Sequence, residues 1–213
     1  MPVRTIPLSH RSVTGRLASR PGQPAVAFES SLERDFALLQ LFDPAVETVE
    51  EQPVRIAYTA PDNRPAHYTP DFLVVCRPDG PPPRLVEVKY QAELDAKAPD
   101  YAARFEAARH YATRRGWRFE VVTEVAIRTP RLENARFLLP YRDRPADPGR
   151  CRRLLDRIEE GGAMAAGDLL RAAFPSLGDQ AAGLPCLWHL VATGRIAVDL
   201  DLPLTMTTVL RPA

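Results

Sequence analysis

The chain has 213 residues and a mass of 23.7 kDa, which is enough for one full domain and a small second one. Hydrophobic residues make up 45% and charged residues 26% of the sequence, a balance that excludes a disordered or fibrous protein and is typical of a soluble globular one. The three cysteines are widely spaced and form no CxxC or Cys/His cluster. Neither a disulfide framework nor a zinc site of the usual spacing is therefore expected.

The net charge of +1 hides a strong segregation along the chain. The net charge is +4 over residues 1–27, −7 over 28–100, +7 over 101–153 and −3 over 154–213. Basic stretches around an acidic centre suit a protein that binds a polyanion with its periphery and holds cations in a carboxylate pocket. A solvated surface of mixed sign explains the counts equally well. Lysine occurs only at Lys89 and Lys97, so a lysine in this chain is not background surface charge.

Residues 1–27 contain several prolines and no periodicity, which predicts an extended arm. Patterns of apolar residues and turn formers then predict a helix that follows Ser30 and ends before Pro44, and after it two short strands within 46–59 and a turn at 60–66. A hairpin of strands 68–76 and 84–90 is predicted next. The remaining elements are a helix over 98–115, a strand over 117–125 and a short helix over 129–142. These elements predict an α/β domain.

The segment PADPG at 145–149 is the best linker candidate. It divides the chain into the arm at 1–27, a first domain at 28–145 and a second at 150–213. The second domain has three amphipathic stretches followed by two short strands, which is the outline of a winged helix-turn-helix. No run of about 18 apolar residues is present, so no transmembrane helix is expected. The N-terminus lacks the apolar stretch of a secretory signal, and we expect an intracellular protein.

The predicted hairpin carries two carboxylates and an ammonium. Glu87 and Lys89 are two residues apart in one strand and therefore point to the same face, and Asp71 can lie across from them on the partner strand. Carboxylates in such apolar strands repel each other and raise each other's pKa values. A divalent cation removes that penalty, and Mg²⁺ prefers a site with one or two carboxylates and several waters. An ordinary salt bridge on a surface strand is the alternative interpretation.

Glu33 is a fourth candidate, one turn into the first helix. Ser30 and Glu33 fit a capping box, in which the glutamate returns a hydrogen bond to the helix start. The same helix can also present Glu33 to a metal at the strand pair. The two roles do not exclude each other.

The order of Glu33, Pro-Asp71 and Glu87-x-Lys89 resembles the PD-(D/E)xK nuclease superfamily, and more narrowly the TnsA-type endonuclease subunit of heteromeric transposases. The resemblance covers about residues 25–140. It implies a restriction-endonuclease-like core with a mixed central sheet flanked by helices, followed by a winged-helix-like domain. It also implies that Glu33, Asp71 and Glu87 ligate Mg²⁺, with Mn²⁺ as a substitute, and that Lys89 assists the nucleophile.

The resemblance further implies a substrate and partners. Such proteins hydrolyse double-stranded DNA at the 5′ ends of a transposon, beside a DDE transposase subunit that cuts the 3′ ends and a AAA+ regulator. A cytoplasmic location, at the nucleoid when active and not at a membrane, follows from this. A stand-alone restriction or repair nuclease and a non-catalytic adaptor with the same core remain alternatives.

Further residues are candidates for contact with DNA. The helix over 98–115 and its exit carry Arg104, Arg115 and Arg118, which we expect to contact phosphates. Gln52, before Pro53, is either a polar residue near the substrate or part of a plain turn, and Tyr68 lies where it could meet a phosphate. The stretch 184–194 would be the recognition helix of the winged helix, but it has no Arg or Lys. Protein docking is therefore favoured there over base readout.

Overall fold

The computed structural model describes residues 13–20 and 22–213. The chain divides into two compact units, the first ending at Arg128 and the second spanning Thr129–Ala213. The boundary predicted at residues 145–149 is therefore wrong, since the helix before it, α5 (Pro130–Arg142), packs against α8 (Leu177–Ala192) inside the second unit. The prolines at 145 and 148 mark only a loop and the start of the next helix.

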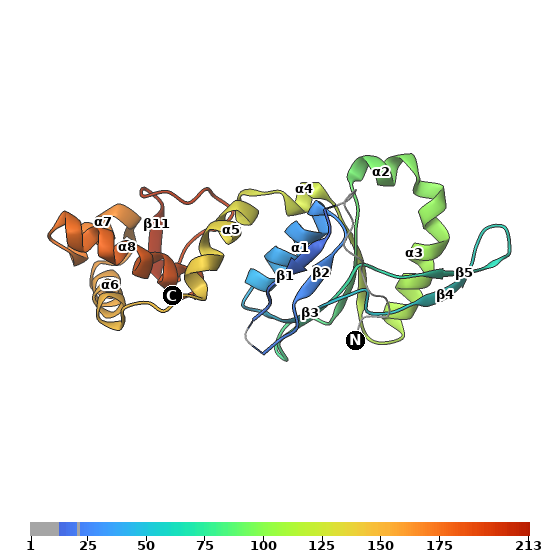
Figure 1. The fold of residues 1–213 in the computed structure, drawn as a ribbon, viewed down its shortest axis with the longest axis horizontal. Coiled ribbons are helices and arrows are strands. Elements are labelled where there is room, and N and C mark those ends of the chain that lie inside the picture. The colour runs from blue at the N-terminus through green and yellow to red at the C-terminus, as the bar shows by residue number, and fades with distance from the viewer. Residues whose placement is uncertain (1–12, 21) are drawn as a thin grey trace. The chain divides into compact units, whose positions relative to one another are not determined.

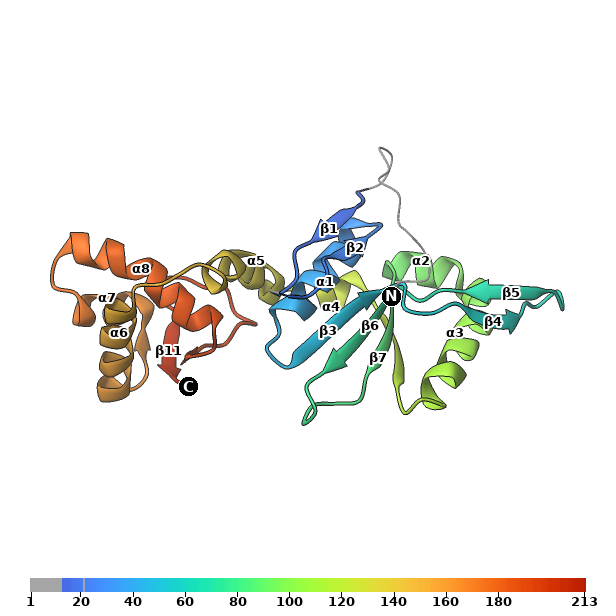
Figure 2. The same ribbon diagram turned by 60° about the horizontal axis from the view of Figure 1, so that its bottom comes forward.

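The first unit is built on a four-stranded sheet (Figures 1 and 2). Its strands lie in the order β3 (Val46–Glu51), β6 (Phe72–Cys76), β7 (Arg84–Val88) and β8 (Arg118–Val122). The first two junctions are antiparallel and the β7–β8 junction is parallel, so the sheet is mixed. The hairpin predicted for 68–76 and 84–90 is confirmed, although both strands are shorter than expected.

Two helices cover opposite faces of this sheet. Phe36 of α1 (Ser31–Phe42) lies 5.4 Å, ring to ring, from Phe72 on β6. Leu85 on β7 packs with Phe105 of α3 (Ala98–Thr113). Phe72 pairs with Val86, and side chains alternate along a strand, so Phe72 and Leu85 point to opposite faces.

The segment predicted as an extended arm is folded where the structure describes it. β1 (Gly15–Leu17) pairs antiparallel with β2 (Val26–Phe28), and β2 is buried along its whole length. The guanidinium of Arg20 donates to the carbonyl oxygens of Val46 and Asp43. These bonds fix the segment to β3 and the end of α1, while residues 1–12 and 21 of the predicted arm lie outside the described residues.

A second hairpin, β4 (Ile56–Thr59) with β5 (Pro65–Tyr68), extends from the sheet (Figure 1). The turn predicted at 60–66 is shorter than expected, because Pro65 and Ala66 already belong to β5; proline is tolerated in such an edge strand. Two short helices, α2 (Gln91–Ala96) and α4 (Glu124–Ile127), were not predicted.

The second unit contains, in chain order, α5, α6 (Pro148–Gly161), β9 (Met164–Ala165), α7 (Ala166–Ala173), α8, β10 (Ile196–Ala197) and β11 (Val209–Pro212). Its short strands pair antiparallel in the order β10-β11-β9. The three predicted helices and the two strands after them are present, and β9 was not predicted. Fully buried leucines and isoleucine from the helices and β11 form the core, namely Leu138, Leu154, Ile158, Leu169, Leu187, Leu190 and Leu210.

A buried amide holds the long loop before β11. Asn134 of α5 donates from Nδ2 to the carbonyl oxygens of Leu200 and Leu202, at 2.8 Å each, and accepts from the backbone N–H of Leu204 at 3.1 Å. The loop is thereby tied to α5. Within the part of the chain that the structure describes, no helix is long and apolar enough to span a bilayer.

Candidate active site

The C-terminal end of β7 brings together the carboxylates predicted from the hairpin. Phe72 of β6 pairs with Val86 of β7, so the next residues, Asp71 and Glu87, lie side by side at the strand ends. The backbone N–H of Val88 donates to Oδ2 of Asp71 at 2.7 Å. This bond fixes the Asp71 side chain against β7.

Lys89 joins the two carboxylates. Its Nζ lies 2.8 Å from Oε1 of Glu87 and 3.7 Å from Oδ2 of Asp71, and it donates to the carbonyl oxygen of Val88 at 3.1 Å. The exposed fractions of the three side chains are 22% for Lys89, 18% for Asp71 and 4% for Glu87. The structure thus brings Asp71, Glu87 and Lys89 together in one partly enclosed cluster, as the strand alternation predicted.

The cluster carries more negative than positive charge in a poorly solvated place. Burial raises the pKa of Asp71 well above its usual value, and the nearby Glu87 and Glu33 raise it further against the opposing effect of Lys89. Burial alone would lower the pKa of Lys89, but Asp71 and Glu87 outweigh it and the pKa is raised. Lys89 is therefore an ammonium at neutral pH, and the site favours additional positive charge.

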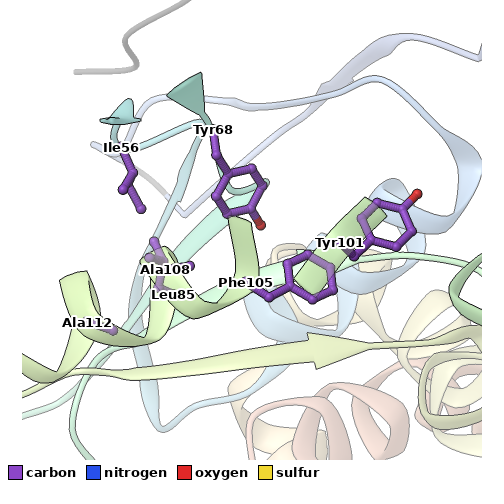
Figure 3. Packing of buried hydrophobic residues seen from close by; sticks show 7 residues of the cluster. All are labelled: Ile56, Tyr68, Leu85, Tyr101, Phe105, Ala108 and Ala112. Atoms are coloured by element: carbon purple, nitrogen blue, oxygen red, sulfur yellow. The ribbon is translucent and has the colours of Figure 1, made fainter. Parts of the chain in front are cut away.

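A buried tyrosine fixes the other oxygen of Glu87. The hydroxyl of Tyr68, at the end of β5, donates to Oε2 of Glu87 at 2.6 Å. Burial and the charge of Glu87 raise the pKa of Tyr68, which keeps the phenol protonated and able to donate. Its ring lies 6.2 Å, centroid to centroid, from that of Phe105 on α3, and Figure 3 shows the two rings side by side in the apolar cluster. Sequence reasoning considered Tyr68 only as a phosphate contact, because nothing in the pattern links it to Glu87.

Glu33 occupies the first turn of α1 and performs the predicted capping role. Ser30 accepts from the Glu33 N–H at 3.1 Å, and the two side chains bond at 2.9 Å. Oε2 of Glu33 accepts from the backbone N–H of Glu29 at 2.7 Å. Burial raises the pKa of Glu33, while Lys89 lies within electrostatic range and acts to lower it. The helix start therefore places Glu33 beside the cluster without a direct ion pair to Lys89 among the contacts described.

The donor chemistry of the cluster fits a hard divalent cation. Asp71, Glu87 and the Val88 carbonyl all present oxygens to the Lys89 ammonium, and Mg²⁺ is commonly held by one or two carboxylates with waters completing its shell. In residues 13–20 and 22–213 no three carboxylate, histidine or cysteine side chains form a ready-made metal cage. Glu33 lies within electrostatic range of Asp71, but among the described residues only Asp71 and Glu87 share a direct partner, Lys89.

The three arginines predicted to contact DNA lie in different places. Arg104 of α3 stacks on the ring of Tyr101 at 4.6 Å and lies within electrostatic range of the Tyr68 hydroxyl, next to the cluster. Arg115 stacks on Tyr111 at 3.6 Å, beyond the far end of α3. Arg118 begins β8 opposite Arg84, four residues and so about 13 Å along the strand from the end beside Lys89. The structure brings Arg104 to the site but not Arg115 or Arg118.

Comparison with known proteins agrees with this geometry. Residues 43–124 match a family model described as "TnsA-like endonuclease N terminal", and no curated protein gave a match to the chain. The matched segment includes Asp71, Glu87 and Lys89 and begins after Glu33. The resemblance inferred from the sequence is therefore confirmed over this segment, which is similar to the N-terminal domain of TnsA-like endonucleases.

Proposed function

We propose that the protein is a Mg²⁺-dependent DNA endonuclease that cleaves the 5′ ends of a transposon. One observation carries the proposal: Lys89 joins the carboxylates of Asp71 and Glu87 at distances of 3.7 and 2.8 Å inside a TnsA-like endonuclease domain. The mixed sheet with a helix on each face supports a restriction-endonuclease-like core. The reaction would be hydrolysis of a phosphodiester that leaves a 5′-phosphate and a 3′-hydroxyl.

Asp71 and Glu87 would hold Mg²⁺, for which Mn²⁺ would substitute, and Glu33 would complete the site directly or through water. When bound, Mg²⁺ supplies a Lewis acid that acidifies a water and offsets the negative charge developing on the phosphate. The hydrogen bond from Tyr68 holds the Glu87 carboxylate in one orientation. A metal site keeps its geometry when its ligands are oriented in this way. The Val88 N–H does the same for Asp71.

Lys89 would act as a charged donor rather than as a base. Its raised pKa keeps the amine protonated at neutral pH, so it cannot take a proton from the attacking water in that state. The ammonium can orient the water and stabilise the charge on the phosphate in the transition state. Arg104, Arg115 and Arg118 would contact phosphates of the duplex, with Arg104 nearest to the cleaved bond.

The second unit is proposed to be a winged-helix-like interaction domain. From α6 onward, its order of helix, strand, two helices and two strands, with a three-stranded sheet, supports this. Its α8 contains no Lys or Arg, which disfavours base readout. We propose that it docks to protein, namely to the AAA+ regulator, while a DDE transposase subunit directs cleavage to the transposon ends at the nucleoid.

The test is nicking of a supercoiled plasmid that carries the transposon ends, with Mg²⁺, Mn²⁺ or EDTA, and with or without the DDE transposase of the same transposon. We expect cleavage at the 5′ ends that requires the metal and the partner, and that is lost in Lys89→Ala. Cleavage at a defined short site without any partner would favour a stand-alone nuclease. Nicking that persists unchanged in Lys89→Ala would leave only the adaptor function.

A further inference from the structure

Gln52 has an unusual backbone conformation beside the cluster. Among the described residues, only Gln52 (φ 44°) and Asn63 (φ 60°) combine a positive φ with a side chain. Asparagine tolerates this left-handed region in an exposed turn, which is where Asn63 lies, between β4 and β5. Glutamine does not favour it, and the following Pro53 favours an extended conformation at Gln52. Such strain persists only where surrounding bonds hold it.

A backbone hydrogen bond connects Gln52 to Asp71. The ladder between β3 and β6 ends with the pair Glu51 and Phe72, and one more bond follows it, from the Gln52 N–H to the Asp71 carbonyl oxygen at 2.8 Å. Pro53 has no N–H and cannot extend the ladder. The strained residue Gln52 therefore donates the last backbone hydrogen bond of this ladder, and the acceptor of that bond is Asp71.

The side chain of Gln52 is connected to Glu33 by two hydrogen bonds that pass through Glu29. Its Nε2 donates to Oε1 of Glu29 at 3.3 Å, and the Glu29 N–H donates to Oε2 of Glu33 at 2.7 Å. The opposite amide orientation would set an oxygen against the Glu29 carboxylate, so the bond fixes which atom is the donor. A continuous chain of hydrogen bonds therefore connects Asp71, Gln52, Glu29 and Glu33.

The side-chain oxygen of Gln52 takes part in none of these hydrogen bonds. The residue is only 8% exposed, and its Oε1 is buried without a hydrogen-bond partner in the described part of the chain. An unmatched buried acceptor destabilises a fold. Together with the strained backbone, it marks a position kept for something other than stability.

We propose that Gln52 is a positioning residue of the nuclease site, which sets the distance between Asp71 and Glu33 through its backbone N–H and its side-chain amide. The inference rests on the proposed function. Gln52 contacts neither substrate nor reacting atoms in this role. It acts on the two carboxylates, one through the strand end and one through Glu29.

The test compares Gln52→Gly with Asn63→Gly in the plasmid-nicking assay. Glycine relieves the left-handed strain at both positions, but only the first change removes an amide that spans the site. We expect Gln52→Gly to lower the single-turnover rate by roughly 10- to 100-fold with little change in KM, while its thermal midpoint stays equal to or above that of the wild type. Asn63→Gly should keep the wild-type rate.

A second variant separates positioning from packing. Gln52→Glu keeps the size of the side chain but replaces the Nε2 donor with an oxygen facing Glu29, so we expect a loss of rate at least as large as in Gln52→Gly. Wild-type rates in both Gln52 variants would overturn the inference and leave the proposed function intact. A fall in rate matched by a fall in thermal midpoint would also overturn it, since that is a structural effect. A wild-type protein that does not nick DNA would overturn both proposals.

Discussion

Within the described residues, each unit buries one amide side chain, and the two are bonded differently. Asn134 in the second unit is 5% exposed and uses both N–H groups and its oxygen on the backbone of one loop. Gln52 in the first unit is 8% exposed, has a side-chain oxygen with no hydrogen-bond partner among residues 13–20 and 22–213, and has a strained backbone. The first arrangement is what stability alone favours.

The polar groups at the end of β7 and those at the Asn134 loop also differ in what they cost the fold. At the end of β7, burial and the nearby Glu87 and Glu33 raise the pKa of Asp71, and burial raises the pKa of Glu33, so this site is costly to the fold. The Asn134 loop has no such cost. Polar residues at the β7 end should therefore affect activity more than stability, and Asn134 should do the reverse.

Lys89→Ala should give the largest effect on activity. It removes the only ammonium in contact with Asp71 and Glu87 in the described structure, and we expect nicking to fall by a factor of roughly 10² to 10³. Plasmid nicking under single-turnover conditions measures this. The matched control is Lys97→Ala, which removes an exposed lysine and should leave the rate unchanged. Equal losses in both variants would contradict the assignment of the cluster.

Asn134→Ala should give the largest effect on stability. It leaves two carbonyl groups and one N–H of the loop without their partners, which should lower the free energy of unfolding by about 1–3 kcal/mol. Denaturant unfolding measures this, with Gln91→Ala, an exposed amide, as a neutral control. At temperatures where the chain stays folded, nicking in the presence of the DDE transposase should be unchanged. A loss of nicking in folded Asn134→Ala would break the contrast between the two regions.

Asp71→Asn should stabilise the metal-free protein at pH 7 while lowering the nicking rate. The raised pKa of Asp71 means that the folded state binds this proton more tightly than the unfolded state. The carboxylate therefore weakens the fold as pH rises through its folded-state pKa. The advantage of Asp71→Asn should accordingly be present at pH 7 and vanish below about pH 4. Thermal unfolding with EDTA over this range measures it, and an advantage that grows toward pH 4 would contradict the sign.

Arg104→Ala should give the smallest effect, on DNA affinity. Loss of one phosphate contact should weaken binding and lower the slope of log affinity against log salt by about 1. Titration of a transposon-end duplex at several salt concentrations measures this in the presence of Ca²⁺. Arg118→Ala, at the opposite end of β8, should change affinity less. The reverse order would mean that DNA crosses the other end of the sheet.

The sequence was sufficient to predict the hairpin and the groups at its end. Alternation placed Glu87 and Lys89 on one face, and the apolar strands around Asp71 and Glu87 indicated pairing. The cap at Ser30 and Glu33 followed from spacing. Each of these features depends on residues a few positions apart or on a single hairpin, so local periodicity contains them.

Other features depend on contacts between distant segments and could not be predicted in the same way. The bond from Tyr68 to Glu87 requires the end of the β4–β5 hairpin to meet the end of β7 while the hairpin packs against α3, and no spacing rule encodes that meeting. The conformation of Gln52 opposes the preference of its own dipeptide with Pro53. The boundary between the units was misplaced because the proline-rich loop at 145–149 was the stronger local signal, whereas packing of α5 decides the division.

The scarcity of lysine makes the cluster accessible to chemical labelling. Acylating reagents attack unprotonated amines, and the chain offers two side-chain amines, at Lys89 and Lys97. Lys97 is exposed, whereas Lys89 is shielded and held in its protonated form by its acidic neighbours. Mass spectrometry of a partly acylated sample would therefore report the electrostatic state of the Asp71, Glu87 and Lys89 cluster directly, without DNA and without turnover.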